Sequence, residues 1–370
     1  MSEPRVAARH GSMYSTGNAA ETQAMIHFAV DFSSDTQTRP TPGMRQAIAN
    51  AEVGDEQKRE DPSVNRLQER VAALTGKDAA LFLPTGTMCN LIAHAIHCRP
   101  GDEIIIESSC HPVHFEGGGP AVHSRASVKT IDTETGVFSA EQVEAAIRPD
   151  DPHFPRTRLV CVENTHNLQG GRVWPLEAVK LVAECARRHG LLMHLDGARL
   201  LNAVVATGTP AAEYCGHFDS CWIDLSKGLG CPAGGVLAGS VAFIAQAWRL
   251  KHLFGGAMRQ AGILAAAGVY ALDHHVERLA EDHAKARQLA EGLAAIDGIR
   301  VDVDAVETNM VMFDIEGTRM QRGVFLQRLA DHAVRFSPLL KPTRLRAVTH
   351  LDIPADGVAR ALAAVRDVLK

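Results

Sequence analysis

The sequence lacks the features that mark membrane-spanning and secreted proteins. It contains no run of about 20 apolar residues, the length that a membrane-spanning helix needs. The eight cysteines occur singly, without CxxC pairs or a compact disulfide spacing, so reduced and mostly buried thiols are expected. The segment before Phe28 has no continuous apolar stretch of the kind found in signal peptides. We therefore expect a cytoplasmic protein.

Runs of a single charge and a strong compositional bias are also absent. The 38 basic and 43 acidic residues are mixed along the chain and give a formal net charge of −5, which argues against nucleic-acid and membrane-surface partners. With 46% hydrophobic, 22% charged and 5% aromatic residues, the composition excludes disordered and fibrous classes. A small molecule is the expected partner.

The pattern along the 370 residues predicts an α/β protein with two unequal domains. Between residues 79 and 240, short apolar runs alternate with helical patterns, which is typical of βα repeats and a largely parallel sheet. Asp61 followed by Pro62 marks one helix start. The expected strands are AALFLP, DEIIIES, RLVCVEN, LLMHLD, CWIDLS and GGVLAG.

Beyond residue 268 the alternation changes into a long helical pattern over 274–295, a strand over 309–315 and a last helix after Asp356. This pattern indicates a small α+β domain. The predicted organisation is an N-terminal extension (1–26), a large domain (27–268) and a small C-terminal domain (269–370).

Lys227 is a candidate for Schiff-base chemistry. It follows the apolar run CWIDLS and opens a glycine-rich turn, which places it at the edge of a buried sheet. Partial burial favours the neutral amine, the form that attacks a carbonyl. A surface lysine beside a tight turn fits this segment about equally well.

Asp196 ends the apolar run LLMHLD, and Arg199 follows three residues later. The carboxyl end of a strand in an open α/β sheet faces the ligand crevice, where a carboxylate can hold a pyridine-type nitrogen protonated. A helix N-cap or an ion pair with Arg199 explains the same residue at least as well. Taken alone, Asp196 leaves both interpretations open.

Thr85, Gly86 and Thr87 lie where the strand ALFLP meets a helical pattern. The free backbone N–H groups and hydroxyls at such a helix start form an anion site that a phosphate would fit. Many strand-to-helix turns of this composition bind nothing, so this motif alone decides little.

Two histidines are further candidates. His111 follows a predicted strand, and His153 lies in a polar loop. An imidazole can stack on an aromatic cofactor or move a proton near neutral pH. With 18 histidines in the chain, a surface or packing role is the more frequent explanation for any one of them. No metal site is expected, because no pair has a convincing ligand spacing and the segment HHVE lacks the HExxH pattern.

Together these motifs resemble the low-specificity L-threonine aldolases, pyridoxal-phosphate (PLP) enzymes of fold type I in the aromatic amino acid β-eliminating lyase and threonine aldolase superfamily. The resemblance extends from Asp31 to the C-terminus. It is specific because several of the segments have no general structural reason to occur together. They are, in family order, SDTQTRP, DPSVNRLQ, PTGTMCN, PDDPHFPRTR, ENTHN, DGARLLNA, SKGLG, GGAMRQAG, TNM and RAVTHLD.

The resemblance implies a large domain with a mainly parallel seven-stranded sheet flanked by helices, and a role for each candidate residue. Lys227 would be the Schiff-base lysine, Asp196 the partner of the pyridine nitrogen, and His111 the residue that stacks on the PLP ring. The other implied cofactor-binding residues are Thr85, Gly86, Thr87, Arg199 and Arg259. The implied ligands of the substrate carboxylate are Ser34, Arg199 and Arg346.

The implied reaction is retro-aldol cleavage of a β-hydroxy-α-amino acid, such as L-threonine or L-allo-threonine, to glycine and an aldehyde, with His111 and His153 as the candidate bases. A PLP-dependent β-elimination or decarboxylation of another amino acid is an alternative, because the same carbanion can be reached by breaking a different bond. A PLP-binding protein without catalysis is a third reading. A homodimer or homotetramer is expected.

One segment departs from the family. Where the family usually reads VGDDVYGEDP, this chain reads VGDEQKREDP, so Lys58 and Arg59 replace a tyrosine and a glycine. Two flexible cations in an active-site loop would alter the aldehyde pocket, weaken turnover or favour an acidic substrate. The natural substrate is therefore left open.

Overall fold

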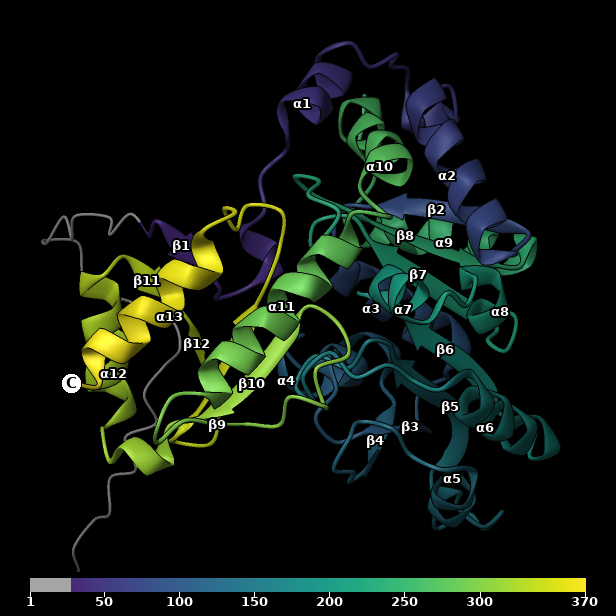
Figure 1. Ribbon diagram of the computed structural model, residues 1–370. Coiled ribbons are helices and arrows are strands. Elements are labelled where there is room, and N and C mark those ends of the chain that lie inside the picture. Colours follow the sequence, from purple (N-terminus) through teal and green to yellow (C-terminus); the bar gives the residue numbers. More distant parts are fainter. Residues whose placement is uncertain (1–27) are drawn as a thin grey trace, which may run out of the picture.

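The computed structural model describes residues 28–370, so the predicted N-terminal extension (1–26) lies outside the described residues. Figure 1 shows a large unit built around a broad sheet and a smaller unit formed mainly by the C-terminal part of the chain. Helix α11 (Leu279–Ala294) packs against α7 (Leu200–Thr207) of the large unit and β10 (Met310–Asp314) of the small one. The predicted α/β class is confirmed.

Within the described residues, seven strands form the large sheet. In spatial order they are β2 (Ala79–Leu83), β8 (Gly235–Gly239), β7 (Ser220–Asp224), β6 (Leu192–Asp196), β5 (Arg156–Glu163), β3 (Asp102–Glu107) and β4 (Ser127–Ile131). β8 runs antiparallel to both its neighbours, and the other pairs are parallel. The mainly parallel sheet confirms the prediction. All six expected strands belong to it, whereas the edge strand β4 was missed because its exposed sequence SVKTI contains no apolar run.

Helices cover both faces of this sheet. Those of the large unit are α1 (Pro42–Ala49), α2 (Pro62–Thr75), α3 (Gly86–His97), α4 (His111–His114), α5 (Ala140–Ala146), α6 (Leu176–Arg188), α7, α8 (Ala211–Cys215), α9 (Val241–Leu253) and α10 (Gly262–His274). Side chains alternate between the two faces of a strand, so Phe82 of β2 packs in a core with α2, α6 and α10, and Leu81 and Leu83 pack in another with α3 and α9. Burying each such side chain stabilises the fold by roughly 1.5–3 kcal/mol.

The predicted start of α2 at Asp61 is confirmed. The Asp61 side chain accepts a hydrogen bond from the backbone N–H of Val64 at 3.1 Å, and Pro62 occupies the first turn. Proline fits there because the first N–H groups of a helix have no acceptor within the helix. Gly76 ends α2 at a φ of +65°, a left-handed conformation that glycine adopts without strain.

The small unit contains a four-stranded antiparallel sheet, a two-stranded parallel pair and helices α11, α12 (Arg322–Asp331) and α13 (Gly357–Val368), counted within the described chain. Its sheet has the order β12 (Ser337–Pro338), β13 (Arg344–Val348), β10 and β9 (Arg300–Val301), and the pair joins β1 (Val30–Asp31) to β11 (Val334–Arg335). The strand and the last helix expected here are both present. Val30 and Phe32 lie in the same core as Phe313, so the N-terminal strand packs with the C-terminal elements.

The helix predicted over 274–295 is wrong at its start. α10 ends at His274, and α11 begins only at Leu279. At this break the His275 ring makes a 2.7 Å hydrogen bond to the carbonyl of Leu229, which holds the chain where it changes direction. Across residues 28–370 no helix has both the length and the apolar character needed to cross a membrane.

Candidate active site

The carboxyl ends of several strands meet the start of α3 around a cavity of about 340 Å³. β5, β6 and β7 end in Glu163, Asp196 and Asp224, and all three carboxylates line this cavity. This is the crevice where open α/β sheets bind ligands. The cavity lining also includes the predicted residues Thr85, Gly86, Thr87, His111, Arg199 and Lys227.

Lys227 reaches into the cavity from the turn after β7, with 16% of its side chain exposed. Its Nζ lies 2.7 Å from Oδ2 of Asp224, and 5.6 Å from the centre of the Trp222 ring. The side-chain hydroxyl of Thr38 donates to the Lys227 carbonyl at 2.8 Å, which fixes the backbone of the turn. The amine is therefore held at one place in the cavity wall.

Asp196 is buried at the end of β6. Its Oδ2 accepts a hydrogen bond from the Asn90 side-chain amide at 2.8 Å, and its Oδ1 accepts one from the backbone of Ala198 at 3.1 Å. Burial, together with the negative charges of Glu163 and Glu116, raises the pKa of Asp196 to about 7. A cationic partner in the cavity would favour the ionised form, so the site suits a protonated ring nitrogen.

The start of α3 is built as an anion site. Thr85 is its N-cap, and the Thr85 hydroxyl accepts a hydrogen bond from the backbone of Met88 at 3.2 Å. The N–H groups of Gly86 and Thr87 open the helix and have no acceptor within it. A Cβ added at Gly86 would lie 2.3 Å from the Trp222 ring, so only glycine allows this close approach.

His111 enters the cavity at the start of α4. Its ring Nδ1 lies 2.8 Å from Oε1 of Glu116, and its backbone N–H donates to Oε2 of Glu163 at 2.7 Å. Burial opposes a charge on the ring, but the hydrogen bond to Glu116 and the charges of Asp196, Glu116 and Glu163 raise the pKa of His111. Glu116 thus orients the ring, and Glu163 holds the backbone of the same residue.

Two arginines lie on the side of the site toward the small unit: Arg199 lines the cavity, and Arg346 contacts Asn167, which also lines it. Arg199 forms two 2.7 Å hydrogen bonds to the carboxylate of Asp35, and both side chains are buried. Arg346 donates to Asn167 at 2.5 Å and to the carbonyl of Ser33 at 3.2 Å. Its Nε is buried and has no hydrogen-bond partner within the described residues, so Arg346 has donor capacity left for a ligand.

Arg346 is not among the residues that line the cavity of the single chain, and neither are three further candidates. Ser34 is the N-cap of the short helix η1 (Asp35–Gln37), and its hydroxyl is bonded to Thr36. His153 lies on a loop with 87% of its side chain exposed and pairs with Asp151. Arg259 is 64% exposed and pairs with Asp55. Their predicted roles stay predictions.

Lys58 and Arg59, the two residues that differ from the family pattern, also lie away from the cavity. Lys58 ends a short helix, η2 (Glu56–Lys58), and is exposed. Arg59 follows in a left-handed conformation with φ of +62°, and its guanidinium lies 5.6 Å from the centre of the Trp248 ring. This stacking gives Arg59 a structural partner that the sequence did not predict.

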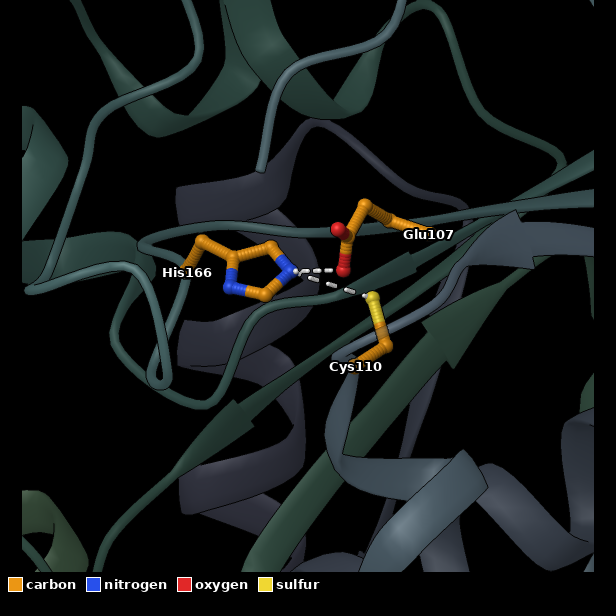
Figure 2. A group of neighbouring side chains, drawn as sticks. All are labelled: Glu107, Cys110 and His166. Carbon is orange, nitrogen blue, oxygen red and sulfur yellow. Dashed lines mark hydrogen bonds and ion pairs between the residues drawn. The ribbon is translucent and has the colours of Figure 1, made fainter. Parts of the chain in front are cut away.

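Figure 2 shows a second group of titratable side chains, Glu107, Cys110 and His166, all buried. His166 Nε2 lies 3.0 Å from Oε2 of Glu107 and 3.4 Å from the Cys110 sulfur. Burial opposes the charge on each partner, but the charge of Glu163 and the pairing with Glu107 raise the pKa of His166, and the hydrogen bond from His166 helps to lower the pKa of Glu107 to about 2. Because the imidazole and the carboxylate face each other at 3.0 Å, we interpret this group as a buried ion pair beside the site.

The ion pair gives a prediction for stability. Because the pKa of Glu107 falls from 4.5 to about 2 on folding, its contribution is complete above about pH 4.5 and is lost as the pH falls toward 2. The contribution of His166, whose pKa is raised, is complete below about pH 6.5 and is lost as the pH rises through its folded-state value. Glu107→Gln should cost about 1–3 kcal/mol between pH 5 and 6.5 and less near pH 3. Urea unfolding across this pH range checks it, and a pH-independent cost would contradict it.

Sequence reasoning missed the residues that hold the candidates in place. Asn90, Glu116, Glu163 and Asp224 each bond to a predicted site residue. Asp224 lies three residues before Lys227 and Glu116 five after His111, so proximity along the chain was an available signal. Asn90 gave none, because its contact with Asp196 depends on how α3 packs against β6.

The donors around the cavity fit one cofactor. An amine can bond to an aldehyde carbon, a buried carboxylate can pair with a ring nitrogen, and a helix start can bind a phosphate. Lys227, Asp196 and the start of α3 supply all three around a single cavity. The fold is that of the fold-type I PLP enzymes, and the residues around the cavity fit PLP.

Comparison with known proteins agrees with this interpretation of the fold and the site. The model of the beta-eliminating lyase family matches residues 31–316. The chain is 42% identical over 354 residues to low-specificity L-threonine aldolase 1 of Arabidopsis thaliana, covering 93% of this chain and 98% of that protein. It is 42% identical over 336 residues to the low specificity L-threonine aldolase of Escherichia coli K12, covering 90% and 97%. The threonine aldolase structure from Leishmania major superposes with a TM-score of 0.80 at 20% identity, covering 92% and 100%.

The chain therefore belongs to the beta-eliminating lyase family, among its low-specificity L-threonine aldolases. It is a PLP-dependent lyase.

Proposed function

We propose that this enzyme cleaves β-hydroxy-α-amino acids of the L-threonine and L-allo-threonine type to glycine and an aldehyde by a retro-aldol reaction. The observation that carries the proposal is the convergence of Lys227, Asp196 and His111 on one cavity, in a chain 42% identical to threonine aldolases over about nine-tenths of its length. When bound, PLP supplies an electron sink for the negative charge that develops at the substrate Cα.

Each residue around the cavity has a proposed task. Lys227 Nζ would hold the cofactor covalently, and the buried carboxylate of Asp196 would keep the ring nitrogen protonated. The N–H groups of Gly86 and Thr87 would bind the phosphate, with Thr85 fixing the start of α3. The hydrogen bonds that hold these side chains are already formed without a ligand. This supports the proposed tasks, because the side chains need not rearrange during the reaction.

We assign the proton transfer at the substrate β-hydroxyl to His111. Its ring is at the cavity wall and is oriented by Glu116. A base must come within hydrogen-bond reach of the proton it removes. His153 lies on an exposed loop outside the cavity of the same chain, which favours His111 within one subunit.

The substrate carboxylate is proposed to bind Arg346, with Arg199 and Ser34 nearby. Arg199 already forms two hydrogen bonds to Asp35, whereas Arg346 has a buried Nε that is free within the described chain. Burial and the neighbouring Arg199 lower the pKa of Arg346 only to about 10, so it remains a cation at neutral pH. A guanidinium matches the geometry of a carboxylate.

Arg346→Ala should raise KM about 10- to 100-fold and lower kcat less, because it removes a binding contact worth roughly 1.5–3 kcal/mol and leaves the cofactor in place. Steady-state kinetics on L-threonine measure both constants. Arg344, which is exposed and two residues earlier on β13, is the matched control, and its alanine variant should change neither constant by more than about twofold. An unchanged KM in Arg346→Ala would remove this residue from the substrate site.

The reaction itself is tested with purified protein and PLP on L-threonine, L-allo-threonine, phenylserine and β-hydroxyaspartate. The proposal predicts aldehyde release from at least one of them. A preference for β-hydroxyaspartate would indicate a cation beside the substrate side chain, such as Lys58 or Arg59 of a neighbouring subunit. Bound PLP without aldehyde from any of the four would reject the aldolase and leave elimination, decarboxylation or a non-catalytic binder.

We further infer that the enzyme assembles as a homodimer or homotetramer and is cytoplasmic. Symmetric assembly is the usual arrangement of soluble enzymes, and the exposed Arg259 and His153 would then be free to face a neighbouring subunit. The eight cysteines are all buried free thiols, which agrees with a reducing compartment. Light scattering after size exclusion tests the assembly, and a monomeric mass would contradict it.

A further inference from the structure

Glu116 and Asn90 connect His111 to Asp196 through a series of hydrogen bonds. Oε1 of Glu116 is 2.8 Å from His111 Nδ1 and accepts from the Asn90 amide nitrogen, also at 2.8 Å. The same amide nitrogen donates its second hydrogen to Oδ2 of Asp196 at 2.8 Å. One amide group therefore bridges the carboxylate beside His111 and the carboxylate proposed to pair with the cofactor ring.

The orientation of Asn90 is fixed by its other contacts. Its carbonyl oxygen accepts from the indole N–H of Trp222 at 2.8 Å and lies 3.1 Å from His194 Nε2. An indole N–H can only donate, so the oxygen of Asn90 must face Trp222 and its NH2 group must face the two carboxylates. All the side chains in this group are buried. The oxygen atoms of Asp196 and Glu116 that face Asn90 are therefore acceptors.

This arrangement determines which nitrogen of His111 carries hydrogen. An acceptor oxygen at 2.8 Å requires a hydrogen on Nδ1. In the neutral ring Nε2 is then unprotonated, and this nitrogen is the one available to a bound molecule. A free imidazole has no such constraint, because either nitrogen can carry the hydrogen.

We propose that Glu116 is a positioning residue that holds His111 in the tautomer with hydrogen on Nδ1, so that Nε2 is the atom that accepts a proton in the cavity, and that Asn90 fixes Glu116 relative to Asp196. The assignment of a proton to Nε2 rests on the proposed function, whereas the tautomer itself does not. In the aldol cleavage, Nε2 takes the proton of the substrate β-hydroxyl as the Cα–Cβ bond breaks and the hydroxyl oxygen becomes the aldehyde carbonyl. The electron pair of the broken bond stays on Cα, which then gains a proton to give glycine.

The negative charges around the His111 ring also support the proposal. The carboxylates that face His111 are Glu116, Asp196 on β6 and Glu163 on β5, and together they raise the pKa of the ring against the effect of burial. Glu116 contacts the ring, whereas Glu163 accepts a hydrogen bond from the His111 backbone N–H. Removing the charge of Glu163 should therefore change the ring's affinity for protons without changing its tautomer.

The test is magic-angle-spinning NMR of protein labelled with 15N-histidine, with the His111 signals assigned by their loss in His111→Gln. The wild type should show the Nδ1–H tautomer with and without PLP. Glu116→Gln should keep this tautomer, because a glutamine oxygen can accept the same hydrogen bonds, but should lower the pKa of the ring. Glu116→Ala should release the ring to a mixture of tautomers, and Glu163→Gln should keep the wild-type tautomer.

Kinetics provide a second readout. Glu116→Ala should lower kcat about 10- to 100-fold with little change in KM. Glu116→Gln should lower kcat less than Glu116→Ala does. In Glu116→Gln the acidic limb of the kcat/KM profile should also move to lower pH. Melting temperatures check that each variant is folded. A wild-type ring in the Nε2–H tautomer, or His111 signals unchanged in Glu116→Ala, would overturn the proposal. The Nδ1–H tautomer in a protein that releases no aldehyde would keep Glu116 as a positioning residue and reject the proposed function instead.

Discussion

Lys227→Ala should lower turnover at least about 10³-fold and abolish the visible absorbance of lysine-bound PLP, while the protein stays folded. The substitution removes the amine that can bond to the cofactor. The protein should stay folded, because Oδ1 of Asp224 keeps its hydrogen bonds from the backbone N–H and hydroxyl of Ser226, and Asp224 lines the cavity, where water can take the place of the amine. Visible spectra with added PLP, aldehyde release and a melting curve measure the three effects.

Lys227→Arg distinguishes the covalent bond that Lys227 is proposed to form with PLP from the effect of its positive charge. Arginine keeps a cation beside Asp224 but does not form a Schiff base with PLP. This variant should be as inactive as Lys227→Ala. If either variant kept more than a few per cent of the wild-type rate, Lys227 would not be the cofactor lysine.

Asp35→Asn should destabilise the fold by about 3–5 kcal/mol, because it leaves the charge of Arg199 buried and uncompensated. Both side chains are at most 5% exposed, and two 2.7 Å hydrogen bonds join them. Burial opposes the ionisation of Asp35, but Arg199, with smaller effects of Lys227 and Arg346, holds its pKa well below the usual range. Urea unfolding of the cofactor-free protein at one fixed protein concentration measures the change.

Glu177→Gln is the matched control for Asp35→Asn. Glu177 pairs with Lys180 on the surface of α6, where 75% and 40% of the two side chains are exposed. A surface pair of this kind contributes less than about 1 kcal/mol. Equal costs in the two variants would show that Asp35 and Arg199 are not the stabilising buried pair described above.

The parts of the site that the sequence predicted share a local signal. Asp196 ends a recognisable apolar strand, Lys227 and the segment Thr85–Thr87 each come just after one, and the carboxyl ends of such strands meet at one edge of a sheet. Their chemistry could therefore be inferred before their distances were known. Which residues share the cavity still required the fold, because the antiparallel β8 lies between β2 and β7.

Residues that act through long-range packing could not be predicted. Asn90 meets Asp196 across 106 positions, and Asp35 meets Arg199 across 164. Both contacts depend on how helices and the small unit pack on the sheet. The periodicity of apolar residues along the sequence carries no information about this packing. The break at His275 between α10 and α11 was missed for the same reason, since it bonds to Leu229 in the turn after Lys227.

The most direct test of the account is to quantify the products that the purified enzyme with PLP forms from L-threonine and L-allo-threonine. Retro-aldol cleavage predicts glycine and acetaldehyde in equal amounts, with both lost in Lys227→Ala. Formation of 2-oxobutanoate and ammonia, with no glycine from either substrate, would contradict the aldolase and identify an eliminating enzyme on the same fold.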